Sequence, residues 1–222
     1  DPDRPIDLVV FRDAGGVEIE TWSALDAETR VSLFSEFDDV ITLGDGDDDV
    51  HALAGNDDVS GNGGDDRLFG DEGDDILRGG DGNDTLDGGA GDDTLEGDDG
   101  DDALSPGPDG GFVMGGAGSD TVVIAVDSGH VFVLDNGTLA DVDVVQFDAS
   151  ILPERTQVRL QGRDLVIVDT SVQSGFTITL SDLAWPADSV HRTEIVRFLA
   201  DGTELDRDDL IARTPQQHRA NG

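Results

Sequence analysis

The sequence predicts an all-β protein built around a parallel β-roll with 18 residues per coil. A small α+β cap is expected at the N-terminal end of the roll, and a β-rich capping domain at its C-terminal end. Three observations predict this architecture: residues 43–123 divide into nine consecutive nonapeptides without insertion or deletion, the eighth residue of each is aliphatic, and glycine and aspartate recur at fixed positions. The expected boundaries are 1–38 for the cap, 39–123 for the roll and 124–222 for the flanking domain.

Composition and charge restrict the kind of partner. The 222 residues include 51 Asp and Glu but only 13 basic residues, all of them Arg, and the formal net charge is −38. A surface this anionic repels phosphate, which excludes nucleic acid as a direct partner. The chain has no cysteine, so a metal site has to rely on oxygen ligands, and these favour hard cations. The longest purely apolar run, 122–126, is far too short to span a membrane.

The nonapeptides predict the roll because each combines a turn with a short strand. Repeats 79–87, 88–96 and 115–123 match G-G-x-G-x-D-x-U-x in full, where U is aliphatic. Glycines at the first, second and fourth positions suit a tight turn with positive φ and close backbone approach. The last three residues alternate polar, apolar and polar, as in a strand with one inward face. Two such units make one coil, and coils stacked about 4.8 Å apart make a parallel β-roll. The aliphatic positions are Val50, Val59, Leu68, Leu77, Leu86, Leu95, Leu104, Val113 and Val122.

The sixth position of the nonapeptide is aspartate in every repeat except 106–114, where Gly111 stands and Asp109 replaces the turn glycine. Successive repeats fall on opposite sides of the roll, so these carboxylates sort into two rows, and Gly111 is expected to close the second. The first row is Asp48, Asp66, Asp84, Asp102 and Asp120; the second row is Asp57, Asp75 and Asp93.

These repeats resemble those of the RTX (hemolysin-type calcium-binding) family. The resemblance implies Ca²⁺ ions between adjacent turns of one row, each held by two sixth-position carboxylates and by backbone carbonyls of the glycine-rich turns. It implies four ions in the first row and two in the second, about six in all. The half repeat 39–41 is in phase and would add a seventh site below Asp57, although its turn lacks glycine. The implied carbonyl ligands are those of Gly79, Gly80, Asp81, Gly82, Gly88, Gly89, Ala90 and Gly91.

The segment before the repeats is expected to cap the open first coil, since solenoids need terminal caps. Residues 6–11 and 17–20 suggest a hairpin around Gly15 and Gly16. Residues 23–26 then have the character of a capping box that opens a short helix. The apolar face of that helix would be Ala24, Ala27, Val31 and Phe34.

The segment after the repeats reads as strands, with hairpin signals at Asn136-Gly137 and Gly162-Arg163. It resembles the region that follows RTX repeats in large secreted bacterial proteins. Leu199 and Ala200 depart from the usual run by one inserted residue. The resemblance implies that this flank caps the roll and nucleates its calcium-driven folding. The expected strands are 121–126, 130–134, 142–147, 157–161, 165–169 and 176–180; the motifs of the resemblance are 144–147, 158–160, 164–167, 195–198 and 201–203.

Charge repulsion predicts that the repeats are disordered without calcium. Residues 43–123 hold 24 acidic residues and 2 Arg. In a closed roll their carboxylates would lie closer together than the Debye length, about 10 Å in 0.1 M salt, and would repel one another. Calcium binding would then contribute to the free energy of folding. An EF-hand starting at Asp81 is the competing calcium site, but it lacks the glutamate at loop position twelve and flanking helices.

No catalytic residues are expected in this chain. The four histidines, His51, His130, His191 and His218, do not form H-E-x-x-H, and no G-x-S-x-G or P-loop motif occurs. We therefore expect a catalytic domain, if there is one, outside the chain. Trp22 and Trp185 are candidate sugar-stacking residues, although core positions are the commoner use of isolated tryptophans.

The RTX resemblance implies a calcium-binding module of a secreted bacterial protein, located outside the cell or at its surface. It also implies export by the type I secretion machinery and folding on calcium after export, with affinities of roughly 10⁻⁴ to 10⁻³ M as in other extracellular modules. Residues 206–222 are not a persuasive secretion signal. Two alternatives remain open: the C-terminal tail of a secreted RTX enzyme or toxin, and a surface adhesin or carbohydrate-binding module with an unidentified glycan or cell-surface partner.

Overall fold

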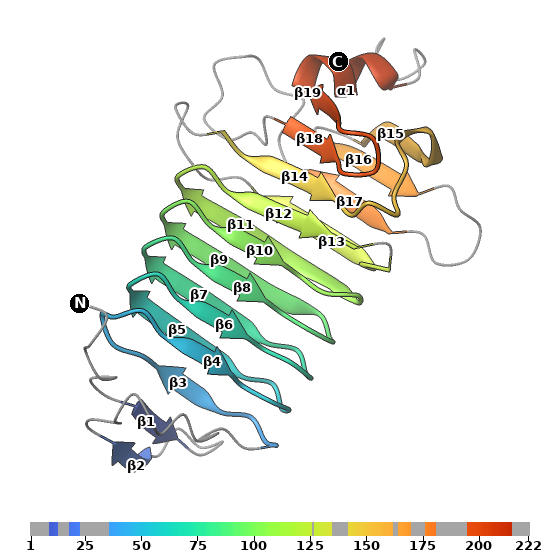
Figure 1. The fold of residues 1–222 in the computed structure, drawn as a ribbon. Coiled ribbons are helices and arrows are strands. Elements are labelled where there is room, and N and C mark those ends of the chain that lie inside the picture. Colours follow the sequence, from blue (N-terminus) through green and yellow to red (C-terminus); the bar gives the residue numbers. More distant parts are fainter. Residues whose placement is uncertain are drawn as a thin grey trace.

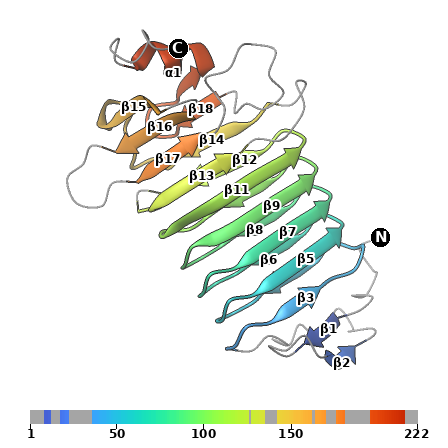
Figure 2. The ribbon, with the colours of Figure 1, turned by 180° about the vertical axis from the view of Figure 1, so that it is seen from behind.

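A computed structural model describes residues 9–12, 18–22, 36–125, 127–134, 142–161, 164–169, 176–180 and 195–214. Within these residues the protein is all-β, apart from one 3-10 turn, Pro153–Arg155, and one helix, α1 (Arg207–Arg213). The strands form two stacked sheets and a separate two-stranded hairpin. Figure 1 shows the strands rising as rungs from the blue hairpin at one end to the red helix at the other, and Figure 2 shows the same stack from behind.

One sheet has nine strands, in the order β15-β16-β17-β13-β11-β9-β7-β5-β3. Neighbours from β3 to β17 pair in parallel, whereas β17, β16 and β15 pair antiparallel. The strands are β3 (Val40–Thr42), β5 (Asp58–Gly63), β7 (Ile76–Asp81), β9 (Asp93–Asp99), β11 (Gly110–Ala117), β13 (His130–Leu134), β15 (Thr156–Gln161), β16 (Asp164–Asp169) and β17 (Thr177–Leu180).

The second sheet has eight strands, in the order β19-β18-β14-β12-β10-β8-β6-β4. From β3 to β14, even-numbered strands lie in this sheet and odd-numbered strands lie in the first, so the chain changes sheet after every strand of this segment. This alternation confirms the predicted coil of turn, strand, turn and strand. The strands are β4 (Asp49–His51), β6 (Arg67–Phe69), β8 (Thr85–Asp87), β10 (Ala103–Ser105), β12 (Thr121–Ile124), β14 (Val144–Phe147), β18 (Ile195–Phe198) and β19 (Thr203–Asp206).

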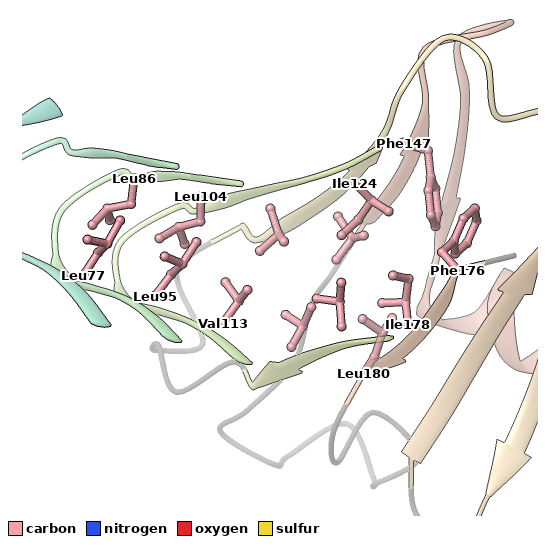
Figure 3. Close-up of a cluster of buried hydrophobic side chains, with 14 of the residues drawn as sticks. Leu77, Leu86, Leu95, Leu104, Val113, Ile124, Phe147, Phe176, Ile178 and Leu180 are labelled. Atoms are coloured by element: carbon pink, nitrogen blue, oxygen red, sulfur yellow. The ribbon is translucent and has the colours of Figure 1, made fainter. Parts of the chain in front are cut away.

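The eighth-position aliphatic residues form the interior, as predicted. All nine are at most 4% exposed. They align across the coils, because Leu68 pairs with Leu86 and Leu77 with Leu95 in the parallel registers. Toward the C-terminal end the interior becomes aromatic: Phe147 stacks on Phe198, with ring centroids 4.8 Å apart. Figure 3 shows this continuous buried cluster from Leu77 to Phe176.

The two parallel stacks continue beyond residue 123. In one stack β12 pairs with β14 and β14 with β18; in the other β11 pairs with β13 and β13 with β17. Antiparallel strands then end both sheets, β19 on one and β16 and β15 on the other. Helix α1 follows β19, and the Asp206 side chain caps it by accepting a hydrogen bond from the Asp209 amide. The predicted domain boundary at 123 stays a prediction.

Two predicted hairpins are confirmed. β1 (Val9–Arg12) pairs antiparallel with β2 (Glu18–Trp22). β15 and β16 pair antiparallel with Gln161 opposite Asp164, which leaves residues 162–163 as the connection. The predicted helix after Ser23 and its apolar face lie outside the described residues.

The hairpin predicted at Asn136-Gly137 is wrong. β13 and β14, on either side of it, belong to different sheets, and each pairs in parallel with strands of neighbouring coils. Asn-Gly is a local turn signal, but Val133 and Val145 are buried in the interior of the stack. Burial of these side chains in the parallel registers therefore outweighs the local preference for a hairpin.

The buried leucine column predicts a specific loss of stability. Replacing Leu86 by alanine leaves a cavity between coils, and we expect the free energy of unfolding of the calcium-loaded protein to fall by about 2–5 kcal/mol. Denaturant melts in saturating calcium measure this change. The control is Thr85→Ala, because Thr85 is the exposed neighbour of Leu86 on β8. A loss below about 1 kcal/mol for Leu86→Ala would contradict the buried-column account.

Candidate metal centre

The sixth-position carboxylates form two buried rows that run along the stack of coils. Seven of them, from Asp57 to Asp120, are between 1% and 3% exposed, and Asp48 is half-buried. One carboxylate oxygen, Oδ1, accepts a hydrogen bond from the backbone N–H of the aspartate one coil earlier. In the first row the N···Oδ1 distances are 2.8–3.0 Å, and the pairs, donor amide first, are Asp48 with Asp66, Asp66 with Asp84, Asp84 with Asp102 and Asp102 with Asp120. In the second row they are Asp39 with Asp57, Asp57 with Asp75 and Asp75 with Asp93, at 2.7–2.9 Å.

The other carboxylate oxygen, Oδ2, is the chemically unusual atom of each residue. Six of these buried Oδ2 atoms accept no hydrogen bond from the described part of the chain: those of Asp57, Asp66, Asp75, Asp84, Asp93 and Asp102. A buried charged oxygen without a partner is costly unless a cation or a proton compensates it. The rows therefore contain six positions at which such compensation is required.

Five of these six oxygens, all except that of Asp57, face a glycine at the first position of a repeat. A Cβ at Gly61 would lie well inside van der Waals contact of Asp66 Oδ2, and it would also meet the carbonyl oxygen of Gly79. The missing side chain therefore leaves a cradle bordered by one carboxylate oxygen and one carbonyl oxygen. The same cradle recurs at Gly70 with Asp75 and the Gly88 carbonyl, at Gly79 with Asp84 and the Gly97 carbonyl, and at Gly97 with Asp102 and the Gly115 carbonyl.

This donor set fits calcium. Ca²⁺ prefers carboxylate and carbonyl oxygens and accepts irregular coordination. A bound Ca²⁺ would supply the positive charge that the buried Oδ2 atoms require. Within the described residues no group of three or more His, Asp or Glu side chains is placed to hold a metal ion. The candidate ligand set instead combines Oδ2 of Asp66, Asp75, Asp84 or Asp102 with a glycine carbonyl.

The predicted carbonyl ligands lie in the turns. The carbonyls of Gly79 and Gly88 border the cradles described above. The carbonyls of Asp81 and Ala90 each accept a hydrogen bond from the preceding coil, from Gly64 N and Gly73 N respectively. Gly80, Gly82, Gly89 and Gly91 have positive φ and shape the turns. Their role as ligands stays a prediction, as does the role of Asp48 and Asp120.

The second row ends as the sequence indicates. At Gly111, where a carboxylate would stand, the backbone packs directly on Asp93, and the two residues pair at the start of β11 and β9. A Cβ at Gly111 would overlap the Asp93 backbone. The sheet thus continues past this point while the row of carboxylates stops.

Besides the two buried rows, the structure contains a set of hydrogen bonds at the fifth position of the repeats that was not predicted from the sequence. Fifth-position side chains on the exposed side of each turn accept hydrogen bonds from the backbone N–H one coil later, the reverse of the direction in the buried rows. Examples are Asp74 Oδ1 with the Asp92 amide and Asn83 Oδ1 with the Asp101 amide. The signal was present, because the fifth position is Asp, Asn or Ser in every repeat except the one with Gly110.

Burial raises the pKa of six of the row carboxyls, those of Asp57, Asp66, Asp75, Asp84, Asp93 and Asp102. The pKa of Asp66, Asp93 and Asp102 rises to about 7 and that of Asp57 to about 6. Desolvation is the main cause, and repulsion from neighbouring aspartates adds to it, whereas the backbone hydrogen bond to Oδ1 lowers the pKa. For Asp66 the repelling neighbours are Asp84, Asp48 and Asp47. These carboxyls therefore favour either a proton or a cation at neutral pH.

Other candidate residues lie away from the rows. His51 pairs with Asp71 on the exposed side and stacks on Phe69. His130 stacks on Phe132 and contacts Thr179 Oγ1. Trp22 lies in β2, whose side chains are not described, and Trp185, His191 and His218 lie outside the described residues.

Comparison with protein-family models identifies the repeats. The RTX calcium-binding nonapeptide repeat matches four copies, at residues 35–59, 60–95, 69–104 and 78–113. A search of curated proteins finds no match. Residues 35–113 are therefore RTX calcium-binding repeats folded as a β-solenoid, as the resemblance implied. Among the described residues no helix is long and apolar enough to cross a membrane.

The cradle makes a glycine-specific prediction. In Gly61→Ala the new methyl group meets Asp66 Oδ2 and the Gly79 carbonyl, and overpacking of this kind costs about 1–3 kcal/mol. We expect a higher calcium concentration at half-maximal folding, measured by circular dichroism.

The control is Gly63→Ala on the same strand. Gly63 lacks a positive φ, and a Cβ there would find its nearest neighbour at 3.7 Å, an ordinary contact. Equal calcium midpoints for the two variants would contradict the cradle.

The raised pKa values predict a pH dependence in chelator. Without a cation the folded row carboxyls bind protons more tightly than the unfolded chain, whose carboxyls titrate near 3.8. The stability that protonation provides is therefore present at low pH and is lost as the pH rises through about 6 to 7. We expect the strand signal in chelator to increase from pH 8 to pH 5, with sedimentation to exclude aggregation. A folded fraction that is constant or increases with pH would contradict this.

Proposed function

We propose that the chain is a calcium-binding module of a secreted bacterial protein, and that binding of several Ca²⁺ ions outside the cell folds its β-roll. The observation that carries the proposal is the set of six buried Oδ2 atoms without hydrogen-bond partners in the described chain. Four of them lie beside a glycine carbonyl in a cradle that excludes a side chain. Both atom types are calcium ligands.

Electrostatics supports a folding role for the ions. Coils stacked about 4.8 Å apart bring successive carboxylates of a row well within the Debye length, so closure without cations concentrates negative charge. The repeats contribute 24 acidic residues against Arg67 and Arg78. Of these, Arg78 is engaged on the outer face, where it bridges Asp58 and Glu96. Calcium that binds the folded rows and not the unfolded chain stabilises the fold by mass action. Several linked sites make the folding transition steep.

We keep the proposed number at six ions, with a seventh at the half repeat. The half repeat joins the roll in register, since Ile41 pairs with Val59 and the Asp39 amide donates to Asp57 Oδ1. These contacts support a turn below Asp57 that follows the pattern of the coils above it.

The cellular part of the proposal follows from the calcium dependence. A chain that stays unfolded at low cytosolic calcium suits passage through the type I secretion machinery, and high extracellular calcium then loads sites of the affinity typical of extracellular modules. On this proposal the chain contributes binding and folding, and any catalysis belongs to another part of the parent protein.

The test compares two neighbouring aspartates. Asp75→Asn keeps Oδ1 as the acceptor for the Asp57 amide but replaces the buried Oδ2, whereas Asp74→Asn makes the same charge change at the exposed fifth position. Asparagine occupies that position naturally at Asn56 and Asn83. Far-ultraviolet circular dichroism is followed during calcium titration, with a parallel magnesium titration.

We expect a steep transition with calcium only, and a midpoint raised about threefold or more in Asp75→Asn but nearly unchanged in Asp74→Asn. A wild-type protein that is fully folded in chelator at pH 7, or that responds equally to magnesium, would overturn the proposal.

A further inference from the structure

The first carboxylate row extends one step beyond the nonapeptides. Asp143 precedes β14, and its Oδ1 accepts a hydrogen bond from the Asp120 amide at 2.8 Å, the same contact as in every earlier coil. Asp143 lies 23 residues after Asp120, whereas the earlier members of the row are spaced by 18. Sequence periodicity therefore did not identify it. Asp143 is 8% exposed, so its carboxylate is buried like those of the row.

The exposed fifth-position row crosses the same junction. Ser119 Oγ accepts a hydrogen bond from the Val142 amide at 3.0 Å, one residue before Asp143. The Val144 amide then donates to the Asp120 carbonyl at 2.8 Å. These contacts place Val122 opposite Val145, so β14 stacks in register despite a coil that is five residues longer.

Beyond this junction lies the aromatic part of the interior. Phe147 on β14 packs on Phe198 and on Phe176, with ring centroids 4.8 and 5.1 Å apart. Figure 3 shows Phe147 and Ile124 in the same buried cluster as the leucines of the repeats. β14 thus connects the large apolar interior with the coil that holds Asp120.

We propose that Asp143 is a positioning residue that anchors the first carboxylate row to the C-terminal strands through the Asp120 amide. By fixing the backbone of Asp120, it sets the register of the last coil of the row. The proposal rests on the proposed function, because the expected consequence is a change in calcium response. Asp143 acts through Oδ1, so its charge is not required for this role.

Asparagine separates this role from direct calcium ligation. Asp143→Asn keeps an Oδ1 acceptor for the Asp120 amide, whereas Asp143→Ala removes it. If Asp143 were a ligand through its charge, both variants would lose calcium sensitivity. The charge-matched control is Asp127→Ala, because Asp127 is exposed between β12 and β13.

The experiment is a calcium titration of the full chain and the three variants at pH 7, followed by circular dichroism. We expect Asp143→Ala to raise the midpoint about twofold or more and to broaden the transition. Asp143→Asn and Asp127→Ala should titrate like the wild type. If Asp143→Ala does not fold at any calcium concentration, wild-type behaviour of Asp143→Asn still supports the proposal.

Two results would overturn the proposal. Asp143→Ala could titrate like Asp127→Ala, which would mean that the anchor is dispensable. Asp143→Asn could fail as Asp143→Ala does, which would assign Asp143 a charge-dependent role instead. Failure of the proposed function is a different outcome, because the wild-type chain itself would then show no calcium transition.

Discussion

The structure depends on buried carboxylates whose charge the hydrogen-bond network compensates only in part. In each coil Oδ1 holds the backbone of the coil before it, while Oδ2 of six such residues has no hydrogen-bond partner among the described residues. The same side chain therefore fastens the stack and makes it unfavourable without a cation or a proton. This conflict explains why a fold with a continuous aliphatic interior can still depend on an ion.

Glycine is favoured at the first and second positions of the repeat for different physical reasons. These two preferences connect the fold with the site. At the first position a side chain would fill the cradle, as at Gly79 beside Asp84 Oδ2. At the second position the backbone has positive φ in every repeat after the first, and Asn62 and Asp71 adopt it where glycine is missing. The first-position glycine is kept in six of the nine repeats and the second-position glycine in five.

The sequence was sufficient to predict most of the structural features that recur every nine residues. The coil, the buried eighth position, the two rows and their end at Gly111 all depend on spacing within residues 43–123. Asp143 was missed because its coil is five residues longer, and the crossing after β13 was mistaken for a hairpin because Asn136-Gly137 is a strong local signal. The fifth-position hydrogen bonds were missed because Asp, Asn and Ser share an acceptor atom rather than a residue type. The position of Asp143 and the crossing after β13 depend on long-range packing, which local patterns do not encode.

Amide hydrogen exchange of the row residues tests the central claim most directly. The amides of Asp57, Asp66, Asp75 and Asp84 are each held by the carboxylate of the next coil. If cations complete the rows, these amides are strongly protected at pH 7 in calcium and exchange at rates near those of an unstructured chain in chelator. Equal protection in calcium and in chelator would show that the rows close without a cation, and it would contradict this account.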